Sequence, residues 1–222
     1  MCHRYSLTDL KAAVAAFSNQ LAEELGDFSP RYNVALTQLM PVITKRASRP
    51  KLERLRFGVL APARTPGERP LLLANARAET LTTKPAFREA ANYRRCLIPA
   101  DGFFEWEKAG TTRLPHYFTL KDRRPFFFGG IYEAPRGDEP GAFCIVTTSP
   151  NPLLASIHDR MPVLLGPNSG PAWLGDEPLP AARLGQLCRP LPADLMTGHR
   201  VDPRMNNVRY EAADAIAAMD VS

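Results

Sequence analysis

The sequence lacks the features that would place it in a membrane or in a cysteine-stapled class. No apolar run is long enough to span a bilayer, and no signal or transit peptide opens the chain. The four cysteines, Cys2, Cys96, Cys144 and Cys188, form no CxxC pair, and their spacings suit neither a zinc site nor a dense disulfide framework. We therefore expect a protein of the reducing cytoplasm, with no membrane contact, no metal and no organic cofactor.

Long helical patterns are scarce, and proline is abundant at 22 scattered residues. This combination favours short strands and turns over long helices. One amphipathic segment, residues 6–26, has apolar residues at spacings of three and four and predicts a single helix, with Ser6 or Thr8 at its start and Gly26 at its end. Shorter helical patterns lie at 151–158, 180–188 and 210–219.

Most of the remaining chain consists of short apolar runs bounded by Pro and Gly, which predict strands. They are residues 33–43, 54–62, 69–75, 96–108, 116–121, 125–132, 142–148 and 161–166. We predict one α+β domain over residues 1–222, built on a mostly antiparallel, strongly bent sheet or open barrel with flanking helices. Cys96 and Cys144 lie within such runs and are predicted to be small buried hydrophobes.

The chain has a modest excess of basic side chains, with a formal net charge of +5. This charge is compatible with a polyanionic partner without requiring one. Residues 45–56 alone carry six basic residues and one acidic residue. Such a stretch is either a solvated loop or a rim that attracts phosphates.

The second residue is a candidate nucleophile. If Met1 is removed, Cys2 carries an α-amino group and a thiol on adjacent carbons, and both groups are partly nucleophilic at neutral pH. Such an aminothiol can condense with an aldehyde to an imine, which the thiol closes to a five-membered thiazolidine. The alternative is that Cys2 is an ordinary residue near a chain end.

Polar residues follow the apolar run that ends at Asn75. Strand alternation would place Asn75, Arg77 and Glu79 on one face. Asn75 offers both a donor and an acceptor, and Arg77 offers a planar fork suited to phosphate. An exposed strand end with an Arg77–Glu79 pair is the alternative.

Two further side chains have the chemistry of proton transfer. Glu105 lies among Phe103, Phe104 and Trp106, and apolar surroundings would raise its pKa towards neutrality. His158 follows a short helical pattern and titrates near neutral pH. A half-exposed strand glutamate and a structural histidine are the alternatives.

Five motifs occur in order along the chain: MCHRY at 1–5, YNVALTQ at 32–38, NARAET at 75–80, DGFFEW at 101–106 and HDRMPV at 158–163. Together they closely resemble the SOS response-associated peptidase (SRAP) family. The resemblance implies a protein of the DNA damage response that crosslinks to abasic sites in single-stranded DNA through a thiazolidine on the cysteine exposed by methionine removal. It also implies possible self-processing of Met1, a nucleoid-associated location in the cytoplasm and, we expect, a monomer.

The resemblance also implies roles for individual residues. Cys2 would be the nucleophile, Asn75 would orient the reacting groups, and Glu105 would assist opening of the sugar ring. His158 would support Schiff-base chemistry and reversal. The residues expected to contact DNA or line the site are Arg4, Asn33, Phe57, Arg77 and Arg160.

The chain departs from the family pattern at three of these places. His3 replaces the usual glycine, Leu36 replaces a proline before the TQ pair, and Phe57 replaces a tryptophan that is expected to stack on DNA bases. Two other functions stay open at this stage. One is a cysteine peptidase or amidohydrolase using Cys2, His158 and Asn75. The other is a single-stranded DNA-binding module without covalent chemistry.

Overall fold

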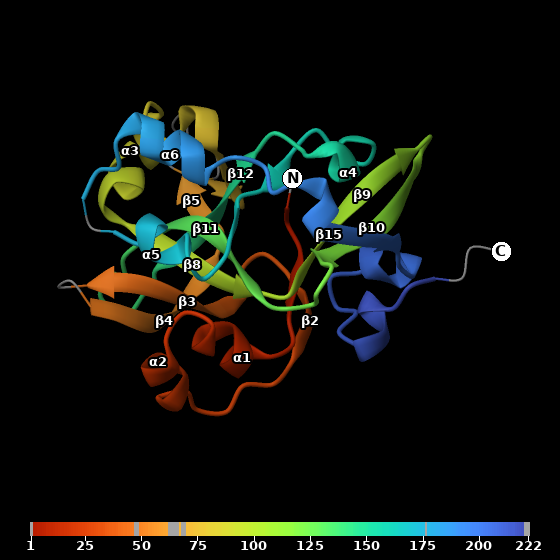
Figure 1. Cartoon of the computed structure of the whole chain (residues 1–222), viewed down its shortest axis with the longest axis horizontal. Helices are drawn as coiled ribbons and strands as arrows, with labels where there is room; N and C mark the ends of the chain where they lie inside the picture. Colours follow the sequence, from red (N-terminus) through yellow and green to blue (C-terminus); the bar gives the residue numbers. More distant parts are fainter. Residues whose placement is uncertain (1, 47–48, 62–66, 68–69, 176, 220–222) are drawn as a thin grey trace.

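Two β-sheets form the centre of the protein (Figure 1). The computed structural model describes residues 2–46, 49–61, 67, 70–175 and 177–219. The smaller sheet has five strands in the order β15, β10, β9, β1 and β2. Their bounds are β1 Tyr5–Leu7, β2 Arg31–Val34, β9 Gly102–Ala109, β10 Thr112–Leu120 and β15 Met196–Arg200.

The larger sheet closes on itself. β12 pairs with both β4 and β11, so β12, β4, β3, β8 and β11 form a ring of five strands. β13, β14 and β7 extend this ring at its edges. The bounds are β3 Leu39–Arg46, β4 Arg49–Phe57, β7 Asn75–Arg77, β8 Arg95–Ala100, β11 Phe126–Glu133, β12 Ala142–Thr148, β13 Met161–Pro162 and β14 Leu164–Leu165.

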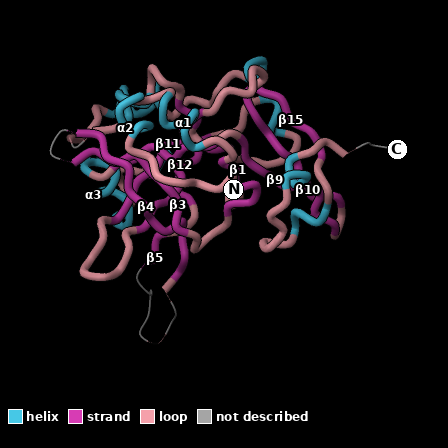
Figure 2. Tube along the Cα trace, turned by 90° about the horizontal axis from the view of Figure 1, so that it is seen from below, coloured by secondary structure: helices cyan, strands magenta, loops and turns pink. Residues whose placement is uncertain are grey.

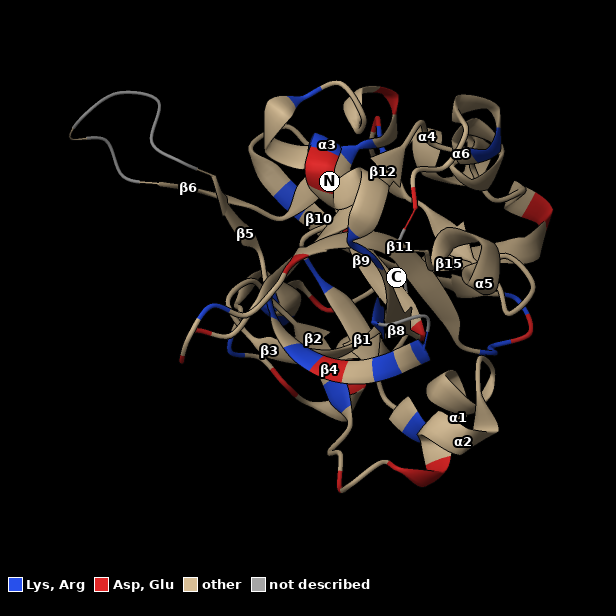
Figure 3. Cartoon of the chain, turned by 90° about the vertical axis from the view of Figure 1, so that its left-hand side faces the viewer, with Lys and Arg blue, Asp and Glu red and all other residues tan. Residues whose placement is uncertain are grey.

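These pairings confirm the predicted α+β fold with mostly antiparallel, strongly bent sheets. The exceptions among the described strands are the parallel pairs of β12 with β4 and with β7. A separate hairpin, β5 Val59–Ala61 and β6 Leu71–Leu73, projects from the molecule (Figure 3).

Aromatic side chains fill the space enclosed by the ring. Tyr5 of β1 packs edge-on against Phe128 of β11 with ring centroids 5.5 Å apart, and Phe57 stacks on Phe143 at 5.1 Å. Because both faces of β8 and β11 are covered, buried residues follow one another along these strands instead of alternating with exposed ones. Cys96 and Cys144 are fully buried free thiols, as predicted.

Helices are short and lie at the margins of the sheets (Figure 1). The α-helices are α1 Leu10–Ala15, α2 Asn19–Glu23, α3 Pro85–Tyr93, α4 Pro152–Ala155, α5 Gly170–Trp173 and α6 Ala181–Leu187. α4 and α6 were predicted, whereas α3 and α5 were not. No helix in the described part of the chain is long and apolar enough to cross a membrane.

The prediction of one helix over residues 6–26 is wrong. The segment begins as strand β1 and continues as α1 and α2. Ser18 ends the helical run by capping a new helix, since its Oγ accepts a hydrogen bond from the Leu21 N–H. Asp9 caps α1 in the same way, because the side chains of Ser6 and Thr8 bind Asp101 instead.

Two other segments differ from expectation. The predicted helix at 210–219 is reduced to a 3-10 turn, Ala213–Ile216. The basic stretch 45–56 belongs to the β3–β4 hairpin and is not a loop at its described positions; residues 47–48 lie outside them. Cross-strand pairing over eight residue pairs supplies the backbone hydrogen bonds that a charged strand needs.

Candidate active site

Strand β1 positions the first residues of the chain. It lies between β2 and β9, and Tyr5 is paired with Val34 on one side and Phe103 on the other. The Asp101 carboxylate accepts hydrogen bonds from the Ser6 hydroxyl and from the backbone and side chain of Thr8. Gly102 is required beside this cluster, because a Cβ there would lie 2.1 Å from the Tyr117 hydroxyl. Residues 2–4 are therefore fixed next to strand β9.

Cys2 is fully buried in this arrangement. Asn75 Nδ2 donates a hydrogen bond to the Cys2 carbonyl oxygen at 3.0 Å, and the Cys2 thiol donates to the Arg4 carbonyl oxygen at 3.7 Å. Burial, aided by the negative charge of Glu105, raises the pKa of the Cys2 thiol well above its ordinary value, so the thiol is neutral here. Met1, whose removal was expected, lies outside the described residues.

Asn75 also has an unused acceptor. Its Oδ1 is buried and has no hydrogen-bond partner among the described residues. Such an orphaned oxygen costs stability unless a ligand or a changed chain end satisfies it. It is available to a donor that arrives near the Cys2 backbone.

Glu105 is nearly fully buried on β9, with 1% of its surface exposed. Its neighbours Phe103 and Phe104 belong to the two hydrophobic clusters on either side of the strand. Burial raises the pKa of Glu105 to about 7, and the negative charge of Asp159 contributes in the same direction. Both protonation states are therefore populated at neutral pH.

His158 lies in the segment after α4. Asn151 caps that helix through a hydrogen bond from the Leu154 N–H to its Oδ1 at 3.1 Å. The Nδ1 of His158 accepts the Arg160 N–H at 3.0 Å and lies 2.9 Å from Asp159 Oδ1. Burial lowers the pKa of His158, while Asp159 opposes that effect. The Arg160 contact fits a neutral ring with its proton on Nε2, and the Asp159 contact fits a ring that is also protonated at Nδ1.

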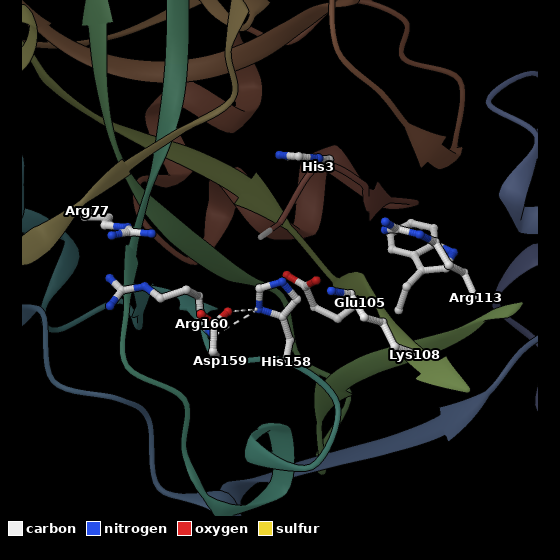
Figure 4. Close-up of a pocket in the computed structure, with 9 residues that line it drawn as sticks. His3, Arg77, Glu105, Lys108, Arg113, His158, Asp159 and Arg160 are labelled. Atoms are coloured by element: carbon white, nitrogen blue, oxygen red, sulfur yellow. Dashed lines mark hydrogen bonds and ion pairs between the residues drawn. The ribbon is translucent and has the colours of Figure 1, made fainter. Parts of the chain in front are cut away.

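A pocket of about 370 Å³, which we call the reaction pocket, brings Glu105 and His158 together, whereas Cys2 and Asn75 are not among its lining residues (Figure 4). Its lining residues are His3, Arg77, Glu105, Trp106, Lys108, Arg113, His158, Asp159 and Arg160. The sequence did not single out Lys108 and Arg113. Lys108 and Arg113 are cross-strand partners in the β9–β10 hairpin. A predicted hairpin after Glu105 would therefore have indicated that these two basic side chains lie next to each other.

The three expected arginines have different surroundings. Arg77 is exposed at the reaction pocket. Arg160 binds the Glu79 carboxylate with both terminal nitrogens, at 2.7 and 2.9 Å, and the Thr147 carbonyl oxygen at 2.7 Å. The alternative of an Arg77–Glu79 pair is therefore wrong, since Glu79 is paired with Arg160.

Arg4 is mostly buried and is held by groups of the protein. One of its terminal nitrogens donates to Asn33 Oδ1 at 2.6 Å and to the Met205 carbonyl oxygen at 3.4 Å. Asn33 is fully buried and donates to the carbonyl oxygens of Asn207 and Tyr210. Asn33 therefore holds the Arg4 side chain in place and does not line the reaction pocket.

Phe57 does not fit its expected contact with DNA. Its side chain has no exposed surface and stacks on Phe143 inside the ring of strands. An aromatic ring must expose a face to stack on a base. Phe57 is therefore a core residue in this structure.

Comparison with known proteins confirms the predicted family. The model of the SOS response associated peptidase family matches residues 1–208. The chain belongs to the SOS response associated peptidase (SRAP) family. Among the SRAP proteins most similar to it, the abasic site processing protein YoqW of Bacillus subtilis is 34% identical over 97% of this chain and 99% of its own. The abasic site processing protein YedK of Escherichia coli is 31% identical, with the same coverage of both chains.

Solved structures give the same fold as this SRAP chain. A protein from Bacteroides thetaiotaomicron aligns with a TM-score of 0.79 and 24% identity, covering 98% of this chain and all of that one. A phage-related protein from Bordetella bronchiseptica aligns with a TM-score of 0.72 and 25% identity, covering 90% of this chain and 94% of its own. The two sheets and their margin helices are thus an arrangement found in other solved proteins.

Proposed function

We propose that this protein forms a covalent thiazolidine with abasic sites in single-stranded DNA, through Cys2 after removal of Met1. The observation that carries the proposal is the burial of Cys2 beside Glu105, a carboxyl group with a pKa of about 7 that itself lines a pocket rich in cations. The curated relatives named above are abasic site processing proteins, which supports the same substrate. The linkage would shield the lesion from strand breakage during the DNA damage response.

Removal of Met1 creates the reactive group. In the unprocessed chain the Cys2 nitrogen is an amide, which is not nucleophilic, whereas in the processed chain it is an amine. The amine adds to the aldehyde of the ring-opened sugar, and loss of one water gives an imine. The thiol sulfur then adds to the imine carbon, and the thiol proton goes to the imine nitrogen. The products are the thiazolidine and one water, with no oxidant or metal consumed.

Glu105 supplies the acid–base step before attack. An abasic sugar is mostly a closed hemiacetal, so a proton must leave its hydroxyl and another must reach its ring oxygen before an aldehyde exists. A group with a pKa of about 7 exchanges protons in both directions at neutral pH. The Glu105 carboxyl performs both transfers under this proposal.

Asn75 and His158 act on the nitrogen and on the departing oxygen. The unpartnered Asn75 Oδ1 accepts a hydrogen bond from the new amine, while its Nδ2 holds the Cys2 carbonyl at 3.0 Å. The protonated His158 ring donates its Nε2 proton to the hydroxyl that leaves as water, and the ring is left neutral. In the reverse reaction a protonated His158 ring donates a proton to the thiazolidine sulfur, and the C–S bond breaks.

The DNA backbone binds across the cationic rim of the reaction pocket. Arg77, Lys108 and Arg113 supply positive charge there, and Trp106 offers an aromatic face. Single-stranded DNA is favoured because an unpaired lesion needs no unstacking from a duplex. We propose that one chain suffices, working as a monomer on DNA in the cytoplasm.

The deciding test uses protein whose intact mass shows loss of Met1, mixed with a single-stranded oligonucleotide that carries one abasic site. We expect a complex that survives denaturing electrophoresis. Cys2→Ala keeps the amine and lacks the sulfur, so it should give only an imine that needs borohydride to be trapped. An equally stable complex from Cys2→Ala without borohydride would disprove the proposal.

The same preparation separates the two alternative functions. Protein with an acetylated α-amine keeps its thiol, so a cysteine peptidase would still cleave an amide substrate, whereas the crosslinking protein would lose its activity. A non-covalent DNA-binding module would give complexes that dissociate in high salt and under denaturing conditions. The family description as a peptidase makes self-removal of Met1 worth measuring in both Cys2→Ala and the parent.

A further inference from the structure

His3 separates the reaction pocket from a second pocket. This second pocket, of about 500 Å³, is lined by residues 35–38 of the β2–β3 turn, by Val208, Arg209 and Glu211 of the C-terminal segment, and by Arg4 and His3. His3 is the residue that lines both pockets. Its side chain is exposed, and Figure 4 shows it at the reaction pocket above Glu105 and His158.

The second pocket has the composition of a nucleoside site. Leu36 and Val208 give it apolar surface, and Val208 is 53% exposed in the protein alone. Its wall is preorganised, because Thr37 is held in a left-handed conformation (φ 72°) by a hydrogen bond from its N–H to the Phe57 carbonyl oxygen at 2.8 Å. Arg209 adds a positive charge suited to a nucleotide.

A strand whose abasic sugar occupies the reaction pocket and whose next nucleotide occupies the second pocket must cross the wall that His3 forms. The link between two consecutive sugars is a phosphodiester. We propose that His3 binds this phosphate through its protonated imidazole, so that DNA binding takes up a proton. This inference rests on the proposed function and names a specificity-determining contact that a glycine at the third position cannot make.

The charges around His3 explain why the proton arrives with the DNA. Partial loss of water contact beside the two pockets, together with the positive charge of Arg4, lowers the pKa of His3, so the ring is neutral in the free protein at pH 7. A phosphate raises that pKa again and accepts a hydrogen bond from one N–H of the charged ring. The other charged groups of the two pockets are Arg77, Glu105, Lys108, Arg113, Asp159, Arg160, Arg209 and Glu211.

The sign of the pH dependence follows. Where the free ring is neutral and the bound ring is charged, each complex takes up one proton, so affinity rises as pH falls. We expect the dissociation constant of the parent to fall by about fivefold to tenfold between roughly pH 8 and pH 6. His3→Asn and His3→Gly should lose most of this change and should bind more weakly at the lower pH.

The experiment measures binding of a single-stranded oligonucleotide that carries a tetrahydrofuran analogue of the abasic sugar. This probe has no aldehyde, so anisotropy at fixed salt reports non-covalent affinity alone. His199→Asn is the matched control, because that histidine lies on β15 with its Nε2 3.0 Å from the Ile216 carbonyl oxygen and lines neither pocket. It should keep the pH dependence of the parent.

A second arm locates the phosphate. A neutral methylphosphonate is placed on one side of the lesion and then on the other, and the parent is compared with His3→Asn. We expect one of the two positions to weaken the parent about fivefold at low pH and to leave His3→Asn unchanged. Equal losses in both proteins at both positions, or an unchanged pH dependence in His3→Asn, would overturn the inference.

Crosslinking to authentic abasic DNA is read separately by denaturing electrophoresis. Stable adducts together with a His3→Asn variant that binds like the parent would overturn the His3 contact alone. A His3-dependent proton uptake without any adduct would overturn the crosslinking function and keep the contact. Failure of the parent to bind the probe at either pH would overturn both.

Discussion

At the scale of single residues, the clearest feature is a conflict between stability and chemistry at Glu105. The side chain is 1% exposed, and its pKa is about 7. The unfolded chain has an ordinary glutamate pKa of about 4.3. Between these two values the folded chain binds more protons than the unfolded chain, so stability falls as pH rises through that window. The protein therefore keeps a group that destabilises it at neutral pH.

Glu105→Gln should reveal this cost. Glutamine does not ionise, so the variant should gain stability relative to the parent as pH rises from about 4 to 8, by on the order of 3 kcal/mol. Urea unfolding of both proteins at several pH values measures the difference. The same variant should form adducts at least about tenfold more slowly, because the acid–base group is gone. Parallel stability curves for the two proteins would contradict the assigned pKa.

Arg77 and Arg160 should respond differently to removal, although both line the reaction pocket. Arg77 is exposed, so Arg77→Ala should weaken DNA binding and reduce the slope of log affinity against log salt by about 0.7, the share of one phosphate on a single strand. Titrations at four salt concentrations give that slope.

Arg160 is occupied by Glu79 and the Thr147 carbonyl oxygen, so Arg160→Ala should keep the salt slope of the parent. It should slow adduct formation instead, because it loosens the segment that presents His158. Glu79→Ala should reproduce this effect. Stronger DNA binding by Glu79→Ala would instead mean that Arg160 reaches a phosphate when released.

At the scale of elements, strand β1 holds the first residues of the chain in a fixed position next to β9. Its three residues are buried between β2 and β9, and Asp101 holds Ser6 and Thr8 through the carboxylate. The hydroxyls of Ser6 and Tyr117 lie 2.7 Å apart and extend this cluster into β10. A chain start is ordinarily frayed, and this cluster is what prevents fraying.

Asp101→Asn should therefore affect the reaction at Cys2, although Asp101 does not line the reaction pocket. Loss of a charged acceptor for three hydrogen bonds should lower the free energy of unfolding by about 2 kcal/mol. Adduct formation at saturating DNA should slow, while binding of the tetrahydrofuran probe should stay close to that of the parent. Asp122→Asn is the matched control, since that carboxylate is exposed and bonds within its own turn. Equal effects of both substitutions would show that β1 needs no such anchor.

The sequence could predict the part of the site that depends on neighbours in the chain, and it could not predict contacts between distant residues. Glu105 and its raised pKa were predictable, because three large apolar neighbours flank it in sequence. The strand at the start of the predicted helix 6–26 was not, because Ser6 and Thr8 bind Asp101, which is distant in the sequence. The pairing of Arg160 with Glu79 was also not predictable, because these residues are distant in the sequence. Periodicity reports which residues are buried and not which polar groups meet.

At the scale of the whole molecule, the C-terminal segment 205–211 packs against Arg4 and strand β2. Figure 2 shows the C-terminal segment beside β9 and β10, near the strand that begins the chain. Arg4 binds Asn33, Asn33 binds the Asn207 and Tyr210 carbonyl oxygens, and Glu211 accepts the backbone N–H groups of Tyr32 and Asn33. The family match ends at residue 208, so part of this support lies beyond it.

Glu211→Ala tests whether that tail serves the site. The substitution leaves two backbone N–H groups of β2 without their acceptor and removes an ion pair with Arg31 at 3.1 Å, so we expect a loss of about 1–3 kcal/mol in the free energy of unfolding. Because Asn33 on the same strand holds Arg4, adduct formation should slow as well. Glu89→Ala, which removes an exposed carboxylate on α3, should change neither quantity measurably. If Glu211→Ala lowers stability and leaves the rate of adduct formation unchanged, the C-terminal segment stabilises the fold without shaping the site.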